Sequence, residues 1–476
     1  MEQALDNATV FITGATGFFG KAVVEKLLRT APHINKIYVL IRPRKGATPT
    51  MRLQRQIMDS RIFDRLRQER VHDFKTFITE KLHAVGGDTT CEGLGLSAED
   101  AAMLHASVNI VIHSAATVSL DEGLQESVST NCLGAMYALS FAEQCQNLRC
   151  HVHVSTAYVN SYQTNMYIHE KLYPLGFDVD AKVHEIQNAT PNQIETIRAN
   201  VLRSGYPNTY TFTKSMAEHL IAARAAKKNI PLVIFRPTII GAAWKEPVPG
   251  WVDQIAGIGA MFVAMSMGVV TVIPGKPHTV IDVVPVDMAV NSMLVATGYK
   301  MVEAQQQPLQ PEPLIVHCGT SDPRQSPLHV RVPATEATRY YRENSPPQAL
   351  APCTLDVTPS SLRFQTKWHL KYTLPMYVFA KLAARTKDKR HEMQAMGLMK
   401  VTRQAKRIVD LFRPFTENSW VYLTDALQDH KRIASFDTTE EWWHTTRDIP
   451  WEAYFTDFCK GLQQYTIRER LPPAKL

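Results

Sequence analysis

One feature limits the possible folds of this chain more than any other. It is a β-rich run that ends in a glycine turn and passes directly into a helix. Residues 9–14 read TVFITG, and glycines follow at the spacing Gly14-x-x-Gly17-x-x-Gly20, ahead of a stretch with apolar residues at helical spacing. Glycine permits a tight turn and close approach of a pyrophosphate, which then meets free N–H groups at the start of the helix. The strand–turn–helix context therefore predicts a dinucleotide-binding site.

Strands and helices alternate after this unit, which is typical of crossover connections and a parallel sheet. Further buried strands are expected at residues 36–43, 82–88, 108–116, 151–156, 230–237 and 313–320. The pattern predicts an α/β fold, a Rossmann-type doubly wound parallel sheet with a mainly helical C-terminal domain. We expect a reductase domain over residues 1–355, with a polar insertion at about 160–205, and a helical domain over 356–476. The proline-rich residues 321–353 are expected to be an irregular boundary.

Charge and cysteine content exclude several classes of protein. The net charge of +7 suits phosphorylated ligands or an anionic lipid surface, and no stretch interleaves basic and aromatic residues as nucleic-acid modules do. The seven cysteines are widely spaced without a Cys-x-x-Cys pair, and no histidines stand at a metal-binding spacing. We therefore expect no disulfide framework and no metal site, in a reducing, cytoplasmic location.

One uncharged stretch, residues 254–275, is long enough to span a bilayer. Glycines and Pro274 interrupt it, and its end resembles a short buried strand, so we expect a buried helix followed by a strand. Its Met-rich part, residues 259–268, is a candidate wall of an apolar channel or simply part of the core. No signal peptide is expected, because helix-forming sequence rather than a cleavage site follows the first apolar run.

The end of the second strand indicates which dinucleotide binds. An NAD site places an acid there, whereas an NADP site places arginine against the 2′-phosphate. This strand ends in Arg42, followed by Arg44, with no acid. We therefore expect NADPH held by Arg42 and Arg44; the alternative is a solvated basic loop. Asp88 lies where an adenine-edge acceptor would fall, and it could equally be a turn residue.

A Tyr-x-x-x-Lys spacing occurs three times, at Tyr210/Lys214, Tyr167/Lys171 and Tyr377/Lys381. Only the first pair opens a helix between two predicted sheet strands, where it can face a nicotinamide. A lysine one turn away is expected to lower the pKa of the tyrosine and suit it to act as a general acid on a carbonyl oxygen. A hydroxyl from the preceding strand end, Ser155 or Thr156, can hold the same oxygen.

Together these residues resemble the extended short-chain dehydrogenase/reductases and, within them, the alcohol-forming fatty acyl-CoA reductases. The resemblance rests on ITGATGFFGKAVVEKLLR, IYVLIRPRKG, NIVIHSAATVSLDE, VSTAYVN, NTYTFTK and FRPTIIGAAWKEPVPGWVD, in order from the N-terminus, and more loosely on the C-terminal end. It implies NADPH-dependent reduction of a long-chain acyl-CoA or acyl-carrier-protein thioester to a primary alcohol through an aldehyde, a reaction of lipid metabolism and wax ester biosynthesis.

By motif match to this family, the catalytic positions are Thr156, Tyr210 and Lys214, with Ser155 adjacent. The same match makes Asn131 a helix residue that supports the site. Alternatively, Asn131 is an ordinary helix residue whose side chain forms a hydrogen bond with the backbone. The expected cofactor contacts are Gly14, Thr16, Gly17, Phe18, Gly20, Arg42, Arg44, Asp88, Ala115, Asn131, Tyr210 and Lys214.

Two rival activities stay open on the same fold, a thioester reductase that stops at the aldehyde and a nucleotide-sugar epimerase or dehydratase. The basic stretch 367–387 is a candidate for contact with a membrane surface or with the phosphates of coenzyme A, or it is a helix solvated on one side. Some family members end in an apolar anchor, whereas this chain ends in the polar IRERLPPAKL, so we expect at most peripheral contact with a membrane.

Overall fold

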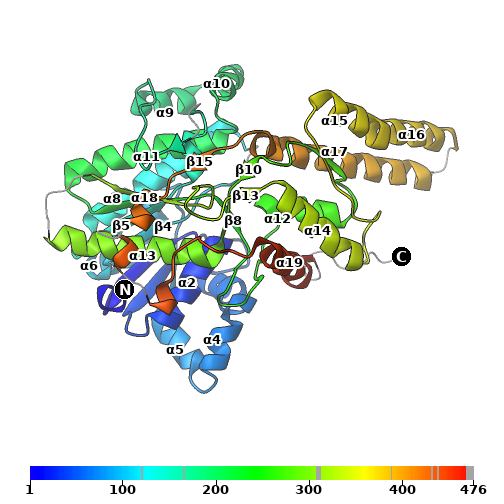
Figure 1. The fold of residues 1–476 in the computed structure, drawn as a ribbon. Helices are drawn as coiled ribbons and strands as arrows, with labels where there is room; N and C mark the ends of the chain where they lie inside the picture. The colour runs from blue at the N-terminus through cyan, green and yellow to red at the C-terminus, as the bar shows by residue number, and fades with distance from the viewer. Residues whose placement is uncertain are drawn as a thin grey trace.

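The computed structural model describes residues 1–118, 122–163, 167–306, 312–386, 389–429, 433–436 and 439–467. At its centre is a parallel sheet of seven strands in the order β12-β7-β5-β4-β1-β2-β3 (Figure 1). The strands are β1 (Thr9–Thr13), β2 (Lys36–Ile41), β3 (Leu82–Gly86), β4 (Ile110–His113), β5 (Cys150–Val154), β7 (Leu232–Pro237) and β12 (Leu314–Cys318). The predicted doubly wound fold is confirmed. The strand order reverses between β1 and β4, which is where ligands bind in such sheets.

Helices cover both faces of the sheet because its strands are apolar on both sides. Val10 and Ile12 of β1 pack with helix α2 (Phe18–Thr30), against which α13 (Val286–Gln306) lies. Phe11 points to the other face and packs on Phe141 of α8 (Gly134–Gln144), beside α6 (Ala98–Ser107) and α11 (Thr209–Lys228). Shorter helices connect these layers: α1 (Glu2–Leu5), α3 (Pro49–Leu53), α4 (Asp64–Glu69), α5 (Phe74–Lys81) and α7 (Leu124–Val128).

The polar insertion folds into two helices, α9 (Val179–Asn188) and α10 (Pro191–Arg203), which pack on α11 on the side away from the sheet (Figure 1). The capping box of Thr190 and Gln193 begins α10. The uncharged stretch forms α12 (Gly257–Ser266) and β9 (Val272–Pro274), both largely buried, as expected. Among the described helices, none combines the length and the apolar run needed to cross a membrane.

The C-terminal part is mainly helical, as predicted: α15 (Ser361–Trp368), α16 (Leu374–Thr386), α17 (Lys389–Glu417), α18 (Asp425–Gln428) and α19 (Trp451–Gly461). Two short parallel strand pairs join it to the rest of the chain. They are β14 (Asp356–Thr358) with β9, and β15 (Val421–Tyr422) with β6 (Tyr167–Ile168). Two further pairs are β8 (Ile239–Gly241) with β11 (Val283–Pro285), and β10 (Val280–Ile281) with β13 (Leu328–His329).

The expectation that residues 321–353 are irregular is wrong, because α14 (Arg331–Glu343) lies within them. Pro333 occupies the first turn of this helix, where proline is tolerated because the N–H that it lacks has no helical partner. Pro333, Ala337 and Tyr341 form a buried stripe, and α14 packs against α19. Tertiary packing therefore outweighs the proline-rich composition.

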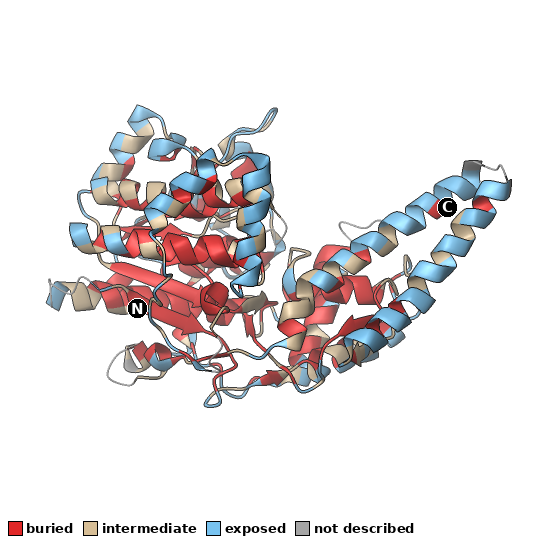
Figure 2. Ribbon diagram, turned by 90° about the horizontal axis from the view of Figure 1, so that it is seen from above, coloured by how far each residue is buried: buried red, intermediate tan, exposed pale blue. Residues whose placement is uncertain are grey.

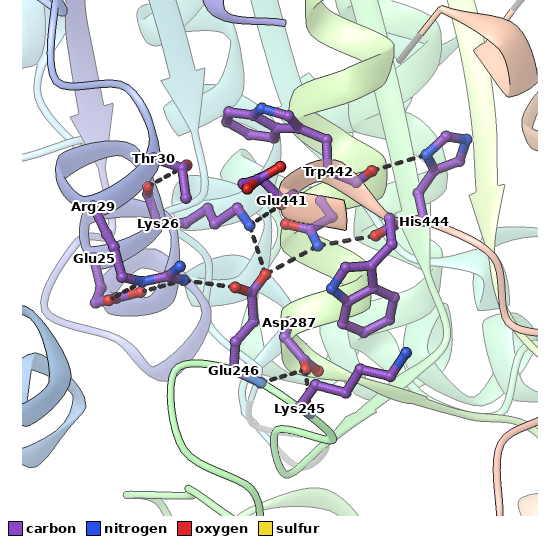
Figure 3. Close-up of polar contacts among 12 residues, drawn as sticks. Glu25, Lys26, Arg29, Thr30, Lys245, Glu246, Asp287, Glu441, Trp442 and His444 are labelled. Atoms are coloured by element: carbon purple, nitrogen blue, oxygen red, sulfur yellow. Dashed lines mark hydrogen bonds and ion pairs between the residues drawn. The ribbon is translucent and has the colours of Figure 1, made fainter. Parts of the chain in front are cut away.

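A buried ion-pair network holds α2 against three other segments (Figure 3). Glu246, in the loop after β8, accepts hydrogen bonds from Lys26 (2.5 Å) and Arg29 (2.8 Å) of α2 and from Asn291 of α13 (3.2 Å). Arg29 also pairs with Glu25 at 2.7 Å. Lys26 donates to the carbonyl of Glu441 and lies over the Trp442 ring. Asp287 accepts the backbone N–H groups of residues 244–246, which fixes the loop that carries Glu246.

Replacing Glu246 with alanine should lower the free energy of unfolding by about 3–5 kcal/mol, because the cations of Lys26 and Arg29 would then be buried without their shared carboxylate. The measurement is urea denaturation of the purified protein. The matched control is Glu69→Ala, which removes an ion pair of two half-exposed side chains, Arg65 and Glu69, and should cost about 0.5 kcal/mol or less. Equal losses in the two variants would contradict a central role for the network.

Candidate active site

A cavity of about 690 Å³ opens at the carboxyl ends of β1, β4, β5 and β7. The glycine turn, the strand ends, the start of α11, and parts of α12 and α17 line it. Of the residues expected from the sequence, the cavity brings together Gly14, Thr16, Gly17, Phe18, Gly20, Arg42, Ala115, Ser155, Thr156, Tyr210 and Lys214. Arg44, Asp88 and Asn131 are not part of its lining.

Two of the three glycines in the turn, Gly14 and Gly20, have no room for a side chain. Gly14 has φ +78°, and a Cβ there would lie 2.6 Å from the backbone nitrogen of Ala115. A Cβ on Gly20 would lie 2.4 Å from the carbonyl oxygen of Gly14. Gly17 is the N-cap of α2, and no side chain caps the first N–H groups of this 13-residue helix. This cradle fits the pyrophosphate of a dinucleotide, because the uncapped N–H groups and the helix dipole favour an anion.

Tyr210 and Lys214 lie one turn apart near the start of α11, which Asn208 caps by accepting the N–H of Thr211 at 2.9 Å. The Lys214 ammonium donates to the carbonyl of Val154, the last residue of β5, at 2.7 Å. Burial lowers the pKa of Lys214 to about 8. Burial also raises the pKa of Tyr210 above its ordinary value. The expected lowering of the tyrosine pKa by Lys214 is therefore not seen, because burial governs the shift and the ammonium is directed at Val154.

The two hydroxyls that follow β5 differ in their partners. The Thr156 Oγ1 accepts the N–H of Tyr158 and donates to the carbonyl of Pro237, both at 3.4 Å. The Ser155 Oγ is buried and has no hydrogen-bond partner within the described residues, while its backbone N–H donates to Phe235 at 2.7 Å. Both hydroxyls border the cavity beside Tyr210, so either can reach an oxygen atom placed there.

The other Tyr-x-x-x-Lys pairs lie away from the cavity. Tyr167 is exposed in the short strand β6, so Lys171 does not follow it on a helical turn. Tyr377 and Lys381 lie on the exposed helix α16, with the ammonium 4.6 Å from the ring centroid. Only Tyr210/Lys214, among the three pairs, borders the glycine turn.

The basic end of β2 forms a cluster of three guanidinium groups. Arg42 makes a two-pronged ion pair with Asp88, with both contacts at 2.7 Å. Asp88 also accepts from the Thr90 N–H and hydroxyl. Arg52 of α3 donates to the carbonyl of Arg42, and its Nε is buried without a partner in the described structure. Burial, followed by repulsion from Arg44 and Arg42, lowers the pKa of Arg52. The single carboxylate of Asp88 therefore leaves the three guanidinium groups with a net positive charge.

Asn131 lies beneath the cavity in a π-helical turn, Ser129–Leu133. Its side chain accepts the N–H of Thr117 at 3.1 Å and donates to the hydroxyl of Thr213 at 3.1 Å. It therefore links the loop after β4 to α11 at Thr213, the residue that precedes Lys214. This placement suits positioning of the site rather than contact with a ligand.

Several lining residues were missed by the sequence analysis. The side of the cavity away from the glycine turn is apolar, and four of its residues lie on α17: Ile408, Leu411, Phe412 and Phe415. Gly257 and Ala260 of α12 line the same side, whereas Met261 and Met265 are buried in the core. No local motif signals these residues, since they follow Tyr210 by 47 to 205 positions and reach it only through the fold.

Comparisons with known proteins find relatives along nearly the whole chain. A family model described as Male sterility protein (NAD-binding) matches residues 12–293, and a second, described as Male sterility protein (Sterile), matches residues 371–469. Fatty acyl-CoA reductase 1 of Mus musculus is 31% identical over 474 residues, covering 99% of this chain and 87% of the mouse protein. The alcohol-forming fatty acyl-CoA reductase of Simmondsia chinensis is 32% identical over 482 residues, covering 95% and 96%.

Among solved structures, the reductase domain of a non-ribosomal peptide synthetase from Mycobacterium tuberculosis matches with a TM-score of 0.61 at 16% identity. The match covers 97% of this chain and 94% of that domain. At this identity the likeness shows the fold alone.

Replacing Gly17 with alanine should weaken binding of the nicotinamide dinucleotide by about tenfold or more, because the methyl group would occupy the approach of the pyrophosphate. The backbone of Gly17 is not left-handed, and the new Cβ would meet only the Gly14 carbonyl at 3.2 Å, so the fold should persist. Fluorescence titration measures the affinity. Gly397→Ala, in open space on α17, is the control and should leave it unchanged. Equal affinities in both variants would show that the turn does not hold the cofactor.

Proposed function

The chain belongs to the fatty acyl-CoA reductase family, and on that premise we propose that it reduces a long-chain fatty acyl thioester to a primary alcohol through an aldehyde, with NADPH as reductant. The observation that carries the proposal is one cavity with two chemically different sides. A glycine turn, Tyr210 and Lys214 border one side, and apolar side chains of α17 border the other. A charged cofactor and a hydrocarbon chain could thus meet beside the tyrosine.

The preference for NADPH over NADH rests on Arg42, Arg44 and Arg52. Three guanidinium groups with one nearby carboxylate, Asp88, favour a ligand that carries an additional phosphate. Asp88 would then orient Arg42 and remains a candidate for the adenine edge. When bound, NADPH supplies a hydride, which carries the two electrons of each reduction.

The side chains of the site handle the oxygen and the proton. Tyr210 keeps its proton at neutral pH, because burial raises its pKa, and can donate it to the carbonyl oxygen. Lys214, with a pKa of about 8, is mostly protonated at neutral pH and stabilises the phenolate that remains. Ser155 or Thr156 donates a second hydrogen bond to the same oxygen. Asn131 positions α11 from below.

The reaction is proposed to proceed in two reductions at one site. In the first, the thioester carbon is reduced and its oxygen takes the proton of Tyr210, which gives a hemithioacetal. The C–S bond then breaks, the thiol leaves with a proton, and an aldehyde remains. In the second, after Tyr210 has regained a proton from solvent, the aldehyde carbon is reduced and its oxygen takes that proton. Retention of the aldehyde between the steps requires a water-poor channel.

The apolar side of the cavity is the proposed site for the acyl chain. Ile408, Phe412 and Phe415 of α17 line it together with Gly257 and Ala260 of α12. The small residues on α12 leave room, and the larger ones on α17 supply apolar contact. Both parts of the chain, divided as proposed near residue 356, therefore contribute residues to the apolar side of the site. The thiol carrier is either coenzyme A or an acyl carrier protein.

Replacing Tyr210 with phenylalanine tests the proposal. We expect the rate of NADPH oxidation with an acyl-CoA to fall by about 10²-fold or more, because the proton donor is lost, while NADPH affinity changes by less than about threefold. Stopped-flow absorbance and fluorescence titration give the two quantities. Tyr377→Phe is the matched control on the exposed helix α16 and should retain full activity. Unchanged turnover in the Tyr210 variant would contradict the assignment.

Replacing Arg42 and Arg44 together with alanine should weaken NADPH binding by about 10- to 100-fold and NADH binding by less than about threefold, since only NADPH carries the 2′-phosphate. Arg65→Ala is the control, because that side chain pairs with Glu69 on α4 and does not line the cavity. Equal weakening for both dinucleotides would mean that these arginines do not select between them.

A further inference from the structure

Three α-helices and a π-helical turn form an arm, which we define as residues 361–417. It comprises α15, the π-helical turn His369–Thr373, α16 and α17. Both ribbon views show α16 and the first half of α17 side by side, extending away from the sheet and its covering helices (Figures 1 and 2). Figure 2 shows that most of their surface is exposed.

Large apolar side chains gather on this arm. Of the 17 large hydrophobic residues that are exposed in the described part of the chain, ten lie between positions 362 and 399, with exposed fractions from 39% to 74%. They are Leu362, Leu370, Leu374, Tyr377, Val378, Leu382, Met393, Met396, Leu398 and Met399. Scattered exposed hydrophobics are ordinary, but a group of this size indicates an interaction surface.

The arm also carries the positive charge of the protein. Residues 361–417 contain 13 Lys and Arg against four Asp and Glu, a net charge of +9, whereas the whole chain has a net charge of +7. The remainder of the chain is therefore slightly negative. The arm is thus both the most basic and the most apolar part of the described surface, which favours an anionic and apolar partner.

The two kinds of side chain share the outer face of α16. Leu374, Tyr377, Val378, Lys381, Leu382 and Arg385 recur at the spacing of one helical face and are all exposed. The opposite face packs on α17, where Ala383 and Ala395 are buried. Lysine and arginine can extend past an apolar layer while their charges stay at its edge, so this face suits the boundary between lipid headgroups and acyl chains.

Helix α17 leads from this surface to the cavity. Met396 lies near the exposed end, and Phe412, 16 residues later, lines the apolar side of the cavity. At 1.5 Å per residue the two positions are about 24 Å apart along one continuous helix.

We propose that the arm docks on an anionic membrane surface, with the outer face of α16 and the Met-rich start of α17 in the headgroup region, so that α17 leads from the bilayer to the acyl side of the cavity. The purpose of docking rests on the proposed function, since fatty acyl substrates and fatty alcohols partition into bilayers. The features that identify the docking surface do not depend on that function. A bilayer fits better than an acidic carrier protein because so many of the exposed side chains are large and apolar.

The test is flotation of the full chain with phosphatidylcholine vesicles and with vesicles that contain about 30% phosphatidylglycerol, at low salt and at about 0.5 M salt. We expect binding to the anionic vesicles only, with loss at high salt. The variant Y377E/V378E/L382E should bind about tenfold more weakly or worse, and so should K381E/R385E, which leaves the apolar residues in place. The control V71E/L350E replaces exposed apolar residues outside the arm and should bind normally.

Binding is measured without substrate, so an inactive enzyme would leave this result unaffected, and turnover of a short-chain acyl-CoA without vesicles checks the proposed function separately. That turnover and the affinity for NADPH should be unchanged in both arm variants, which shows that they fold. Absence of binding to anionic vesicles, or equal binding by arm and control variants, would overturn the proposal. So would a dimer in sedimentation analysis that only the arm variants disrupt, because the surface would then join two copies of the chain.

Discussion

The glutamate at position 246 shares its carboxylate between two cations of α2, and the geometry of the site depends on this buried contact. Helix α2 carries the glycine turn at its N-terminus, so any rotation of the helix would move the phosphate cradle. The same contact draws in α13 through Asn291, and Lys26 reaches the backbone of Glu441 near the C-terminal end. Buried ion pairs contribute little net stability compared with apolar packing, but loss of one partner is costly, so the network fixes one arrangement of these segments.

Two parts of the chain line the cavity, and they contribute different kinds of side chain. The carboxyl edge of the sheet supplies the hydroxyls, the lysine and the glycine turn, because parallel strands end together there. Helix α17 supplies the apolar side, and it can do so because β14 and β15 anchor the C-terminal part to β9 and β6. The proposed catalytic tyrosine borders both a polar and an apolar region, which suits a substrate whose reactive group is polar and whose remainder is hydrocarbon.

The sequence predicted the sheet and the polar half of the site because their signals are local. Apolar runs bounded by glycine and proline identify the buried strands, and the spacing around Gly14 and Tyr210 points to the residues proposed to hold the cofactor. The apolar half was not predictable, since Phe412 meets the sheet only through long-range packing. Arg52 was missed for the same reason. The predicted direction of the Tyr210 pKa shift was wrong because burial, which sequence spacing does not report, raises this pKa. The proline content of residues 321–353 led to the wrong prediction of an irregular segment where α14 lies.

Product analysis with palmitoyl-coenzyme A tests the central claim most directly. The purified protein would be supplied with NADPH and this thioester, free thiol and NADPH oxidation would be followed together, and the lipid product would be identified by chromatography. The account predicts two NADPH oxidised for each thiol released, with hexadecanol as the product. One NADPH per thiol with an accumulating aldehyde would contradict the second reduction, and no oxidation across several chain lengths would contradict the proposed substrate class.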